Sequence, residues 1–388
     1  MDVLTVKKVW RCISMRILFI TNNYYPYSGG VVSSINFFTD ALQSHGHDVK
    51  IATFQFLEMH PNDPQYVYRV PYLISFWYMN NPMVIPRRMH KHILLVINQF
   101  QPDVIHVHHP FLLGVVAQRI ACQKNIPVIF TYHTMYDCYS HYFFPFSWVA
   151  KYISKRYIKR FCNKVTTIVA PSRFVKNMLT ASGLKSVIEV IPTGVQKCFF
   201  EIREPIVNEA VRSPVRLLYV GRMVKEKNIP LLFDVCAQLT VPYTLTLVGY
   251  GVLYETLQKM AYEQYKLSCT DIIFIHRPEK EELVQHYRNS DIFLFPSVTD
   301  TQGVVIVEGM SQSRPVIAIN GPGQQDMVED GNNGYIVFNA SQMAQKIELI
   351  AKNKLLYQSL QRGSFTTSKK YSAKELVKSL LAVYHSCL

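Results

Sequence analysis

The sequence predicts an α/β protein with two Rossmann-like, doubly wound domains that face each other across a cleft. Apolar runs of strand length alternate with amphipathic stretches along the whole chain, which is typical of a doubly wound parallel sheet. The alternation occurs as two series, separated by a polar, irregular region near residues 198–214. At 388 residues, with 49% hydrophobic and 18% charged residues, the chain is long enough for two well-buried domains.

The sequence divides into five segments: an extension, a first domain, a linker, a second domain and a C-terminal helix. Residues 1–14 have basic residues but no signal-peptide pattern, so they are expected to be an extension or to follow a misplaced start. The first domain, 15–200, has predicted strands at 16–21, 48–53, 104–107, 128–132, 166–170 and 187–191. A linker at 201–214 leads to the second domain, 215–366, with predicted strands at 215–220, 244–248, 272–275, 292–295 and 316–319. Residues 367–388 form a helix, apolar on one side, that is expected to pack back towards the first domain.

Composition narrows the class of protein. The eight cysteines are scattered without a C-x-x-C pair, which disfavours a zinc or disulfide framework. No apolar run approaches the ~20 residues that span a bilayer, so a cytoplasmic protein is expected. Residues 1–200 hold 21 Lys/Arg and 8 Asp/Glu, a net charge of +13, whereas residues 201–388 have a net charge of +1. The first half is therefore expected to meet an anionic partner.

The stretch 297–310 is the most informative about function. Asp300 and Glu308 flank a glycine turn at Gly303, after an apolar run of strand length. The Val-Val-Ile-Val run from Val304 fits a strand or a buried helix, and the order strand, polar loop, helix is favoured. Helix-terminus amides would then face an anion, with two carboxylates nearby for hydroxyl groups, which suits a nucleotide sugar. An ordinary βα unit with solvated acids remains the alternative.

Three further glycine loops follow predicted strands. Gly29 and Gly30 would let the backbone approach a phosphate just before a helix, although they do not form G-x-G-x-x-G. The stretch 221–228 contains Arg222 and Lys227, which could neutralise a diphosphate. Gly249 lies in a tight turn after the next strand. Plain glycine turns and a solvated basic loop are the alternatives.

Two polar loops of the first domain contain histidines. His106, His108 and His109 cluster at the end of one predicted strand, but no carboxylate or cysteine ligand set accompanies them, so cleft-lining or core histidines are favoured over a metal site. The aromatic loop 131–142 leaves the next strand and is a plausible acceptor site. There, His133 could hydrogen-bond a sugar hydroxyl or play a structural role.

A basic helix is predicted over 149–164. No acidic residue occurs between Asp137 and Glu189, a stretch with nine basic residues. The helix has one broad basic face, and Trp148 precedes it; the face comprises Lys151, Lys155, Arg156, Lys159 and Arg160. The opposite face is apolar and comprises Ala150, Ile153, Tyr157, Ile158 and Phe161. Such a helix suits an anionic membrane, while a solvated face on a core-packed helix and nucleic acid are the alternatives.

Together these motifs resemble the retaining glycosyltransferases of family 4, which have the GT-B fold. The resemblance runs from Met15 to about Leu381. The stretch 221–227 and the double glycine at Gly29 and Gly30 match that family broadly. The stretches 131–136 and 300–303 look like the diacylglycerol glucosyltransferases, which make α-glucosyldiacylglycerol from UDP-glucose.

The resemblance implies a role for each matching residue. Arg222 and Lys227 would hold the donor diphosphate, Glu308 the ribose diol, and Asp300 and His133 the glucose. The donor would also meet Gly29, Gly30, Gly249, Thr301, Gln302, Gly303 and Val304. The acceptor and membrane would meet His108, His109, Tyr136, Trp148 and the five basic residues of the helix. No metal or cofactor is implied as essential beside the nucleotide sugar.

Several positions depart from the family pattern. Asp300 replaces the usual Glu, Gly309 an Ala, and Val252 a Pro, and the loop 275–278 lacks a common glycine. The expected reaction is glucose transfer from UDP-glucose to a membrane lipid, 1,2-diacylglycerol, at the inner face of the cell membrane. The alternatives are GDP-mannose or another donor, with a phosphoinositide, a lipopolysaccharide or a soluble glycoside as acceptor. A nucleotide-sugar epimerase and a non-catalytic, basic membrane-binding adaptor also remain open, and a nucleic-acid partner is not expected.

Overall fold

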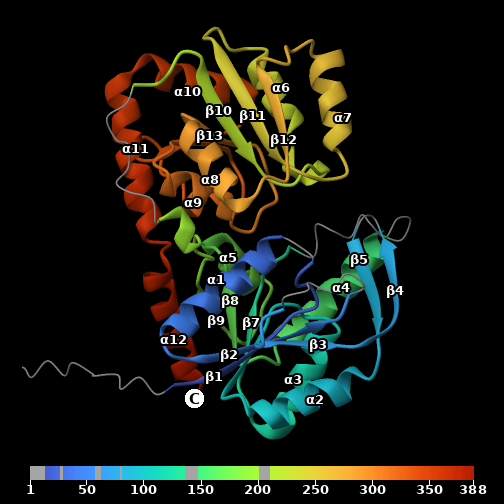
Figure 1. The fold of residues 1–388 in the computed structure, drawn as a ribbon. Coiled ribbons are helices and arrows are strands. Elements are labelled where there is room, and N and C mark those ends of the chain that lie inside the picture. The colour runs from blue at the N-terminus through green and yellow to red at the C-terminus, as the bar shows by residue number, and fades with distance from the viewer. Residues whose placement is uncertain (1–13, 27–28, 57–62, 79–80, 136–146, 201–209) are drawn as a thin grey trace, which may run out of the picture.

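The computed structural model describes residues 14–26, 29–56, 63–78, 81–135, 147–200 and 210–388. They form two α/β domains stacked one above the other (Figure 1). Each domain is built on its own parallel sheet, so the predicted two-domain, doubly wound α/β fold is confirmed. No helix of these residues is both long and apolar enough to cross a bilayer.

The first domain is built on a seven-stranded parallel sheet in the order β3-β2-β1-β6-β7-β8-β9. Its central strands are buried on both faces, which explains their continuous apolar sequences. The strand order reverses between β1 and β6, where ligands bind in open α/β sheets. The strands are β1 (Arg16–Ile20), β2 (Asp48–Phe54), β3 (Val67–Val70), β6 (Val104–Val107), β7 (Val128–Thr131), β8 (Thr167–Ala170) and β9 (Val187–Val190). The helices are α1 (Gly30–Ser44), α2 (Met89–Phe100), α3 (Leu113–Lys124), α4 (Ser147–Cys162) and α5 (Arg173–Ala181).

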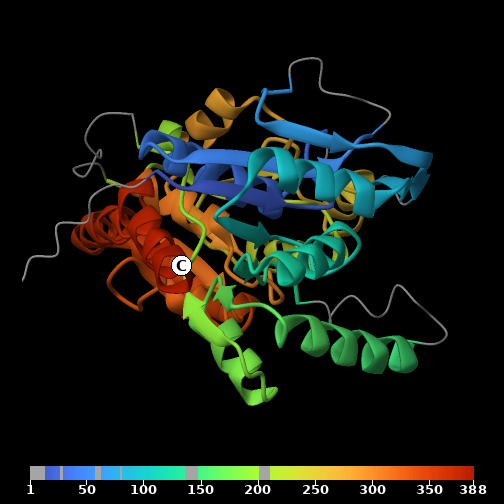
Figure 2. The same ribbon diagram turned by 90° about the horizontal axis from the view of Figure 1, so that it is seen from below.

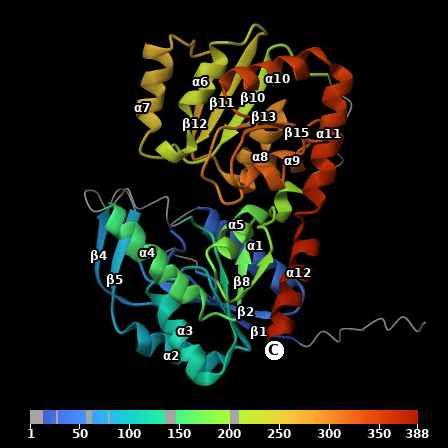
Figure 3. The same ribbon diagram turned by 180° about the vertical axis from the view of Figure 1, so that it is seen from behind.

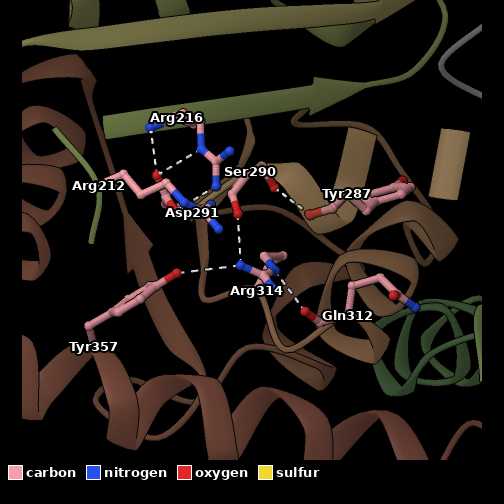
Figure 4. A network of polar contacts seen from close by, with 8 residues as sticks. All are labelled: Arg212, Arg216, Tyr287, Ser290, Asp291, Gln312, Arg314 and Tyr357. Carbon is pink, nitrogen blue, oxygen red and sulfur yellow. Dashed lines mark hydrogen bonds and ion pairs between the residues drawn. The ribbon is translucent and has the colours of Figure 1, made fainter. Parts of the chain in front are cut away.

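The second domain has a six-stranded parallel sheet in the order β12-β11-β10-β13-β14-β15. Its switch point lies between β10 and β13. Buried Asp291 ties these two strands together, because it accepts hydrogen bonds from the backbone N–H of Arg216 at 2.9 Å and from Arg212 Nη1 at 3.1 Å (Figure 4). The strands are β10 (Val215–Val220), β11 (Tyr243–Gly249), β12 (Ile272–His276), β13 (Ile292–Phe295), β14 (Val316–Ile319) and β15 (Gly334–Val337). The helices are α6 (Pro230–Cys236), α7 (Tyr254–Lys259), α8 (Lys280–Asn289), α9 (Val304–Ser311), α10 (Ala340–Lys352), α11 (Lys354–Lys369) and α12 (Ala373–Cys387).

Four strands are missing from the sequence-based prediction. β3 and β15 are edge strands without a clear apolar run, because Arg69 interrupts the half-buried β3 and β15 begins with Gly334. β4 (Tyr72–Tyr78) and β5 (Asn81–Pro86) pair antiparallel and form a separate two-stranded sheet. No helix follows β4, so this hairpin does not fit the strand-helix alternation on which the prediction rested.

The last helix belongs spatially to the first domain. Figure 3 shows α11 and α12 running down one side of the molecule, from the second domain to the first. Val377, Leu380 and Tyr384 of α12 are buried in a core cluster that includes Ile35 and Leu42 of α1. This cluster also contains residues of the second domain, so the two domains share one continuous apolar core.

Candidate active site

The loop between β13 and α9 lies at the carboxyl end of a switch-point strand. Gly303 has a φ of 86° and directly precedes α9, where a side chain would be strained. A Cβ at this position would also lie 3.1 Å from the Phe295 ring. The loop therefore turns into a helix, which confirms the predicted order of strand, loop and helix. The Ile306 N–H donates to the Gly303 carbonyl oxygen at 2.9 Å, whereas the amides of Val304 and Val305, the first two of α9, precede any intrahelical acceptor.

Asp300 and Lys227 form a close ion pair in this loop. Lys227 Nζ lies 2.5 Å from Asp300 Oδ1 and 2.7 Å from Oδ2, and both side chains are mostly buried. Burial acts to raise the pKa of Asp300, but the Lys227 charge and hydrogen bond, a hydrogen bond with Ser297 and the Arg222 charge together lower it below its usual value. Asp300 is therefore a carboxylate, with a cation held against it.

Two glycine loops beside this pair touch each other. Gly249 ends β11 with a φ of 153°, and a Cβ there would lie 1.9 Å from the Gly221 carbonyl oxygen after β10. The backbone at Arg222 is held by Tyr219, whose hydroxyl donates to the Arg222 carbonyl oxygen at 3.1 Å. The Arg222 side chain is exposed. The predicted donor residues Arg222, Lys227, Gly249 and Asp300 thus lie at neighbouring strand ends of one sheet.

Glu308 lies one turn into α9 and accepts a hydrogen bond from the Tyr287 hydroxyl at 2.8 Å. Burial raises the pKa of the Glu308 carboxyl to about 7, although the Tyr287 hydrogen bond and the Lys280 charge act in the opposite direction. A cavity of about 350 Å³ opens beside Lys280 and is also lined by Asn36 and Asp40 of α1, so it lies between the domains.

A polar network in the second domain supports Tyr287 (Figure 4). Arg314 is buried, and its guanidinium donates to the carbonyl oxygens of Gln312 at 2.7 Å and Ser290 at 2.8 Å. The Ser290 hydroxyl in turn donates to the Tyr287 carbonyl oxygen at 2.7 Å. This chain of bonds joins the end of α8 to the segment after α9, the two helices that carry Tyr287 and Glu308.

His133 follows β7 in the first domain and meets the donor loop of the second. The Thr301 hydroxyl donates to the His133 carbonyl oxygen at 2.9 Å. Next to it, Gln302 exchanges two hydrogen bonds of 2.7 Å with the backbone N–H and C=O of Thr193, and both residues are buried. The loop with Asp300 is therefore fixed to both domains, although the residues are 109 and 168 positions apart in the sequence.

A histidine stack lies behind His133. His106 stacks on His108 with ring centroids 4.6 Å apart, and His108 stacks on His133 at 5.2 Å. His106 also contacts the Tyr384 hydroxyl of α12 at 2.6 Å. Burial lowers the pKa of all three rings, that of His106 to about 3, so they are neutral at physiological pH.

His108 orients His133 instead of lining an acceptor site. The expectation that His108 meets the acceptor or membrane is corrected, because this side chain is only 1% exposed, between two other rings. His108 Nδ1 lies 2.9 Å from His133 Nε2, and His108 Nε2 has no partner among the described residues. A buried N–H without an acceptor costs more than an unused acceptor. The favoured tautomer therefore has His108 donating, which leaves the ring proton of His133 on Nδ1.

The remaining residues predicted for the donor and acceptor sites belong to other loops of the first domain. Gly29 and Gly30 stand at the start of α1, as expected. His109 is half-buried, and its Nδ1 lies 3.1 Å from the Thr21 hydroxyl after β1. Burial lowers the pKa of His109 to about 4. Tyr136 lies outside the described residues.

Helix α4 has the predicted basic surface but only part of the predicted apolar face. Lys155, Arg156, Lys159 and Arg160 are exposed. On the other face, Ile158 and Phe161 are buried in the core of the first domain, whereas Ile153 is 59% exposed and Tyr157 38%. The apolar face therefore packs only towards the C-terminal end of the helix. The side chains of Ala150, Trp148 and Lys151 lie outside the described residues.

Several residues of the site carry no motif. Lys280 lies in a mixed-charge run at 279–282, which is typical of an exposed helix start, and Thr193 directly precedes Gly194. Neither these patterns nor the stretch around Tyr287 resembles a donor-binding motif. Only the three-dimensional neighbours of Glu308 and Gln302 reveal their part in the site.

Comparison with known proteins decides the family. A profile described as "Glycosyltransferase Family 4" matches residues 28–197, and one described as "Glycosyl transferases group 1" matches residues 203–365. The chain is a family 4 glycosyltransferase. Both profiles together cover most of this glycosyltransferase, so the resemblance drawn from its motifs is confirmed.

Relatives of this glycosyltransferase include two proteins named alpha-monoglucosyldiacylglycerol synthase. The Streptococcus pneumoniae protein is 28% identical over 347 residues, which cover 86% of this chain and 77% of the relative. The Acholeplasma laidlawii protein is 25% identical over 401 residues, which cover 95% and 96%. Among solved structures, Anabaena HepE in complex with UDP and glucose superimposes with a TM-score of 0.74 at 16% identity, covering 96% of this chain and all of HepE. This structural likeness confirms the GT-B fold.

Proposed function

We propose that this glycosyltransferase transfers glucose from UDP-glucose to the hydroxyl of 1,2-diacylglycerol in an anionic membrane, with retention at the anomeric carbon. The observation that carries the proposal is the loop Asp300–Gly303, which combines a carboxylate paired with Lys227, the free amides of α9 and direct contact with His133. The name shared by the two relatives supports the choice of sugar and acceptor.

In the proposed reaction, the bond between the glucose anomeric carbon and the β-phosphate oxygen breaks as the acceptor oxygen attacks from the same face. UDP leaves and its phosphate oxygen takes the acceptor proton. Lys227, Arg222 and the α9 amides offset the negative charge that grows on the diphosphate. Asp300 and His133 hold the glucose hydroxyls.

Neutral His133 suits a positioning role. Because burial keeps its pKa well below the usual value, the ring offers a hydrogen-bond donor without adding a charge near the leaving diphosphate. Glu308 would accept hydrogen bonds from the ribose diol when ionised. The contacts of Thr301 and Gln302 with the first domain keep the sugar-binding loop beside His133.

The membrane part of the proposal rests on α4, whose exposed side bears Lys155, Arg156, Lys159 and Arg160. Each basic residue near an anionic surface contributes about 1 kcal/mol to binding. The two tyrosines and the isoleucine exposed on the same helix, Tyr152, Ile153 and Tyr157, add apolar area. Peripheral association with the inner face of the cell membrane is expected on this basis.

The test measures release of the nucleoside diphosphate from a panel of nucleotide sugars: UDP from UDP-sugars and GDP from GDP-mannose. Each donor is tested with and without vesicles that contain diacylglycerol and an anionic lipid. We expect turnover with UDP-glucose only when the vesicles contain diacylglycerol, and mass spectrometry should identify a glucosylated lipid. Lys227→Met should abolish turnover, whereas Lys225→Met, on the same turn but exposed, should retain it.

The other outcomes distinguish the remaining candidates. Turnover with a different donor, or without lipid, would contradict the proposed substrates within the same enzyme class. If no donor turns over, Asp300→Glu restores the side chain usual in the family. Failure of this variant as well, together with intact vesicle binding, would favour a non-catalytic membrane-binding protein.

A further inference from the structure

The hairpin β4–β5 exposes one apolar face. Two cross-strand pairs, Ile74 with Ile85 and Phe76 with Met83, share this face because residues two apart on a strand point the same way. The four side chains are between 43 and 51% exposed. Such an aligned set of large apolar side chains on a soluble surface marks an interaction site.

The hairpin is joined to neither large sheet. Its other face is partly covered, because Val84 packs against the core of the first domain, whereas Leu73, at the register shift between Tyr72 and Ile74, is 62% exposed. An isolated two-stranded sheet is marginally stable in water. A partner that covers the outer face would therefore stabilise the hairpin as well as bind it.

The surrounding charges indicate what that partner is. No acidic residue occurs between Asp63 and Asp103. Arg87 and Arg88 follow β5 directly, Lys91 lies on the first turn of α2, and all three are exposed. Apolar side chains with a cationic rim and no acidic neighbour in the sequence complement an anionic lipid surface.

The position of the hairpin agrees with this partner. Figures 1, 2 and 3 all show β4–β5 and α4 projecting from the same side of the first domain. Figure 2, seen from below, shows them at opposite edges of that side. Helix α4 begins on this side and runs back from it, so the hairpin and the start of α4 face the same direction.

We propose that the hairpin inserts Ile74, Phe76, Met83 and Ile85 into an anionic bilayer, with Arg87, Arg88 and Lys91 at the lipid headgroups. The inference rests on the proposed membrane function and extends it, because α4 then becomes one of two contacts. A single helix leaves the enzyme free to rotate about its axis. A second, separate contact fixes the angle between the membrane and the opening between the domains.

The experiment is flotation of the full chain with vesicles of phosphatidylcholine alone or mixed with equal parts of phosphatidylglycerol. Phe76→Ser/Ile85→Ser should bind the anionic vesicles at least about tenfold more weakly than the wild type. The matched control, Phe338→Ser/Leu355→Ser, removes two more strongly exposed apolar residues from the second domain and should bind normally. Equal binding of all three proteins would overturn the proposal.

Two further measurements keep the result interpretable. If the serine variant fails to fold by circular dichroism, Ile74→Thr/Met83→Gln replaces it, since threonine retains the strand preference of isoleucine. Light scattering checks for self-association. A wild-type dimer that the hairpin variant disrupts would assign the face to a second copy and overturn the proposal.

A separate assay distinguishes failure of the hairpin–membrane contact from failure of the proposed transfer reaction. UDP release is measured for the wild type and the hairpin variant with a short-chain diacylglycerol in detergent micelles, where no bilayer is needed. Retained turnover of the variant with weakened flotation supports the hairpin contact. If the wild type floats through its hairpin but turns over no donor, the reaction is contradicted and the hairpin contact stands.

Discussion

Glu308→Gln tests the burial of the carboxyl in α9. In the native protein the pKa of Glu308 is about 7, raised chiefly by burial, against an ordinary value of 4.5. The folded protein therefore binds more protons than the unfolded chain between these two values. Stability from this group is fully present below about pH 4.5 and is lost as the pH rises to about 7.

The magnitude follows from the shift. A difference of about 2.5 units at about 1.4 kcal/mol per unit makes the ionised carboxyl cost up to about 3 kcal/mol. Glutamine remains neutral and can still accept the Tyr287 hydrogen bond. We therefore expect Glu308→Gln to be more stable than the wild type at pH 8, with the advantage shrinking towards zero near pH 4.5.

The assay is urea unfolding, followed by circular dichroism, at a series of pH values from 5 to 8. Glu263→Gln, which changes an exposed carboxyl of the second domain, serves as the control. A difference between Glu308→Gln and wild type that stays constant across the series, or grows as the pH falls, would refute the reasoning. The same pKa predicts a change in nucleotide binding. The ionised fraction of Glu308 at pH 6 is about a tenth of that at pH 8. Because the ionised carboxylate is proposed to bind the ribose diol, the affinity for the nucleotide should fall about tenfold between pH 8 and pH 6.

Three further variants test other features. Lys227→Met should lower kcat/KM for the donor at least about 100-fold and destabilise the fold by about 2 kcal/mol, since Asp300 loses its cation; near-normal turnover would exclude Lys227 from the chemistry. Gly249→Ala should cost about 3 kcal/mol or more in urea unfolding, because the new Cβ meets the Gly221 carbonyl oxygen; an unchanged midpoint would contradict the close contact of the two loops. Gln302→Ala removes two buried interdomain hydrogen bonds and should cost about 2 kcal/mol by the same assay; a smaller loss than for an exposed Gln→Ala change would rule out a clamping role.

Strands buried on both faces could be predicted from the sequence. β6, β10, β13 and β14 have the predicted bounds, because a parallel strand covered on both sides is apolar along most of its length, with only His106 in β6 and Arg216 in β10 as exceptions here. The hairpin β4–β5 could not, since its outward apolar face and its two prolines fit neither an alternating pattern nor a buried run. A hairpin whose outer apolar face is covered by no other part of the described chain therefore shows neither the alternating nor the continuous apolar pattern of a strand.

The candidate active site also has residues that could be predicted from the sequence and contacts that could not. Residues at strand ends, such as Asp300 and Lys227, follow from glycine turns and charges in the sequence. Their pairing does not, because it depends on how β10 and β13 lie next to each other in the sheet. The placement of His108 was also beyond the sequence: a histidine after a strand can face solvent or core, and only the rings packed on both sides of it decide.

The return of α12 to the first domain bears on how the chain is made. Tyr384 is fully buried there and contacts His106, a residue synthesised 278 positions earlier. Domains usually fold in order as they leave the ribosome. Here the first domain cannot close its core until the last helix has been translated, so it must wait while the second domain is synthesised. During that interval α1 exposes the apolar surface that α12 later covers. A chaperone that binds exposed apolar surface is therefore expected to bind the nascent chain.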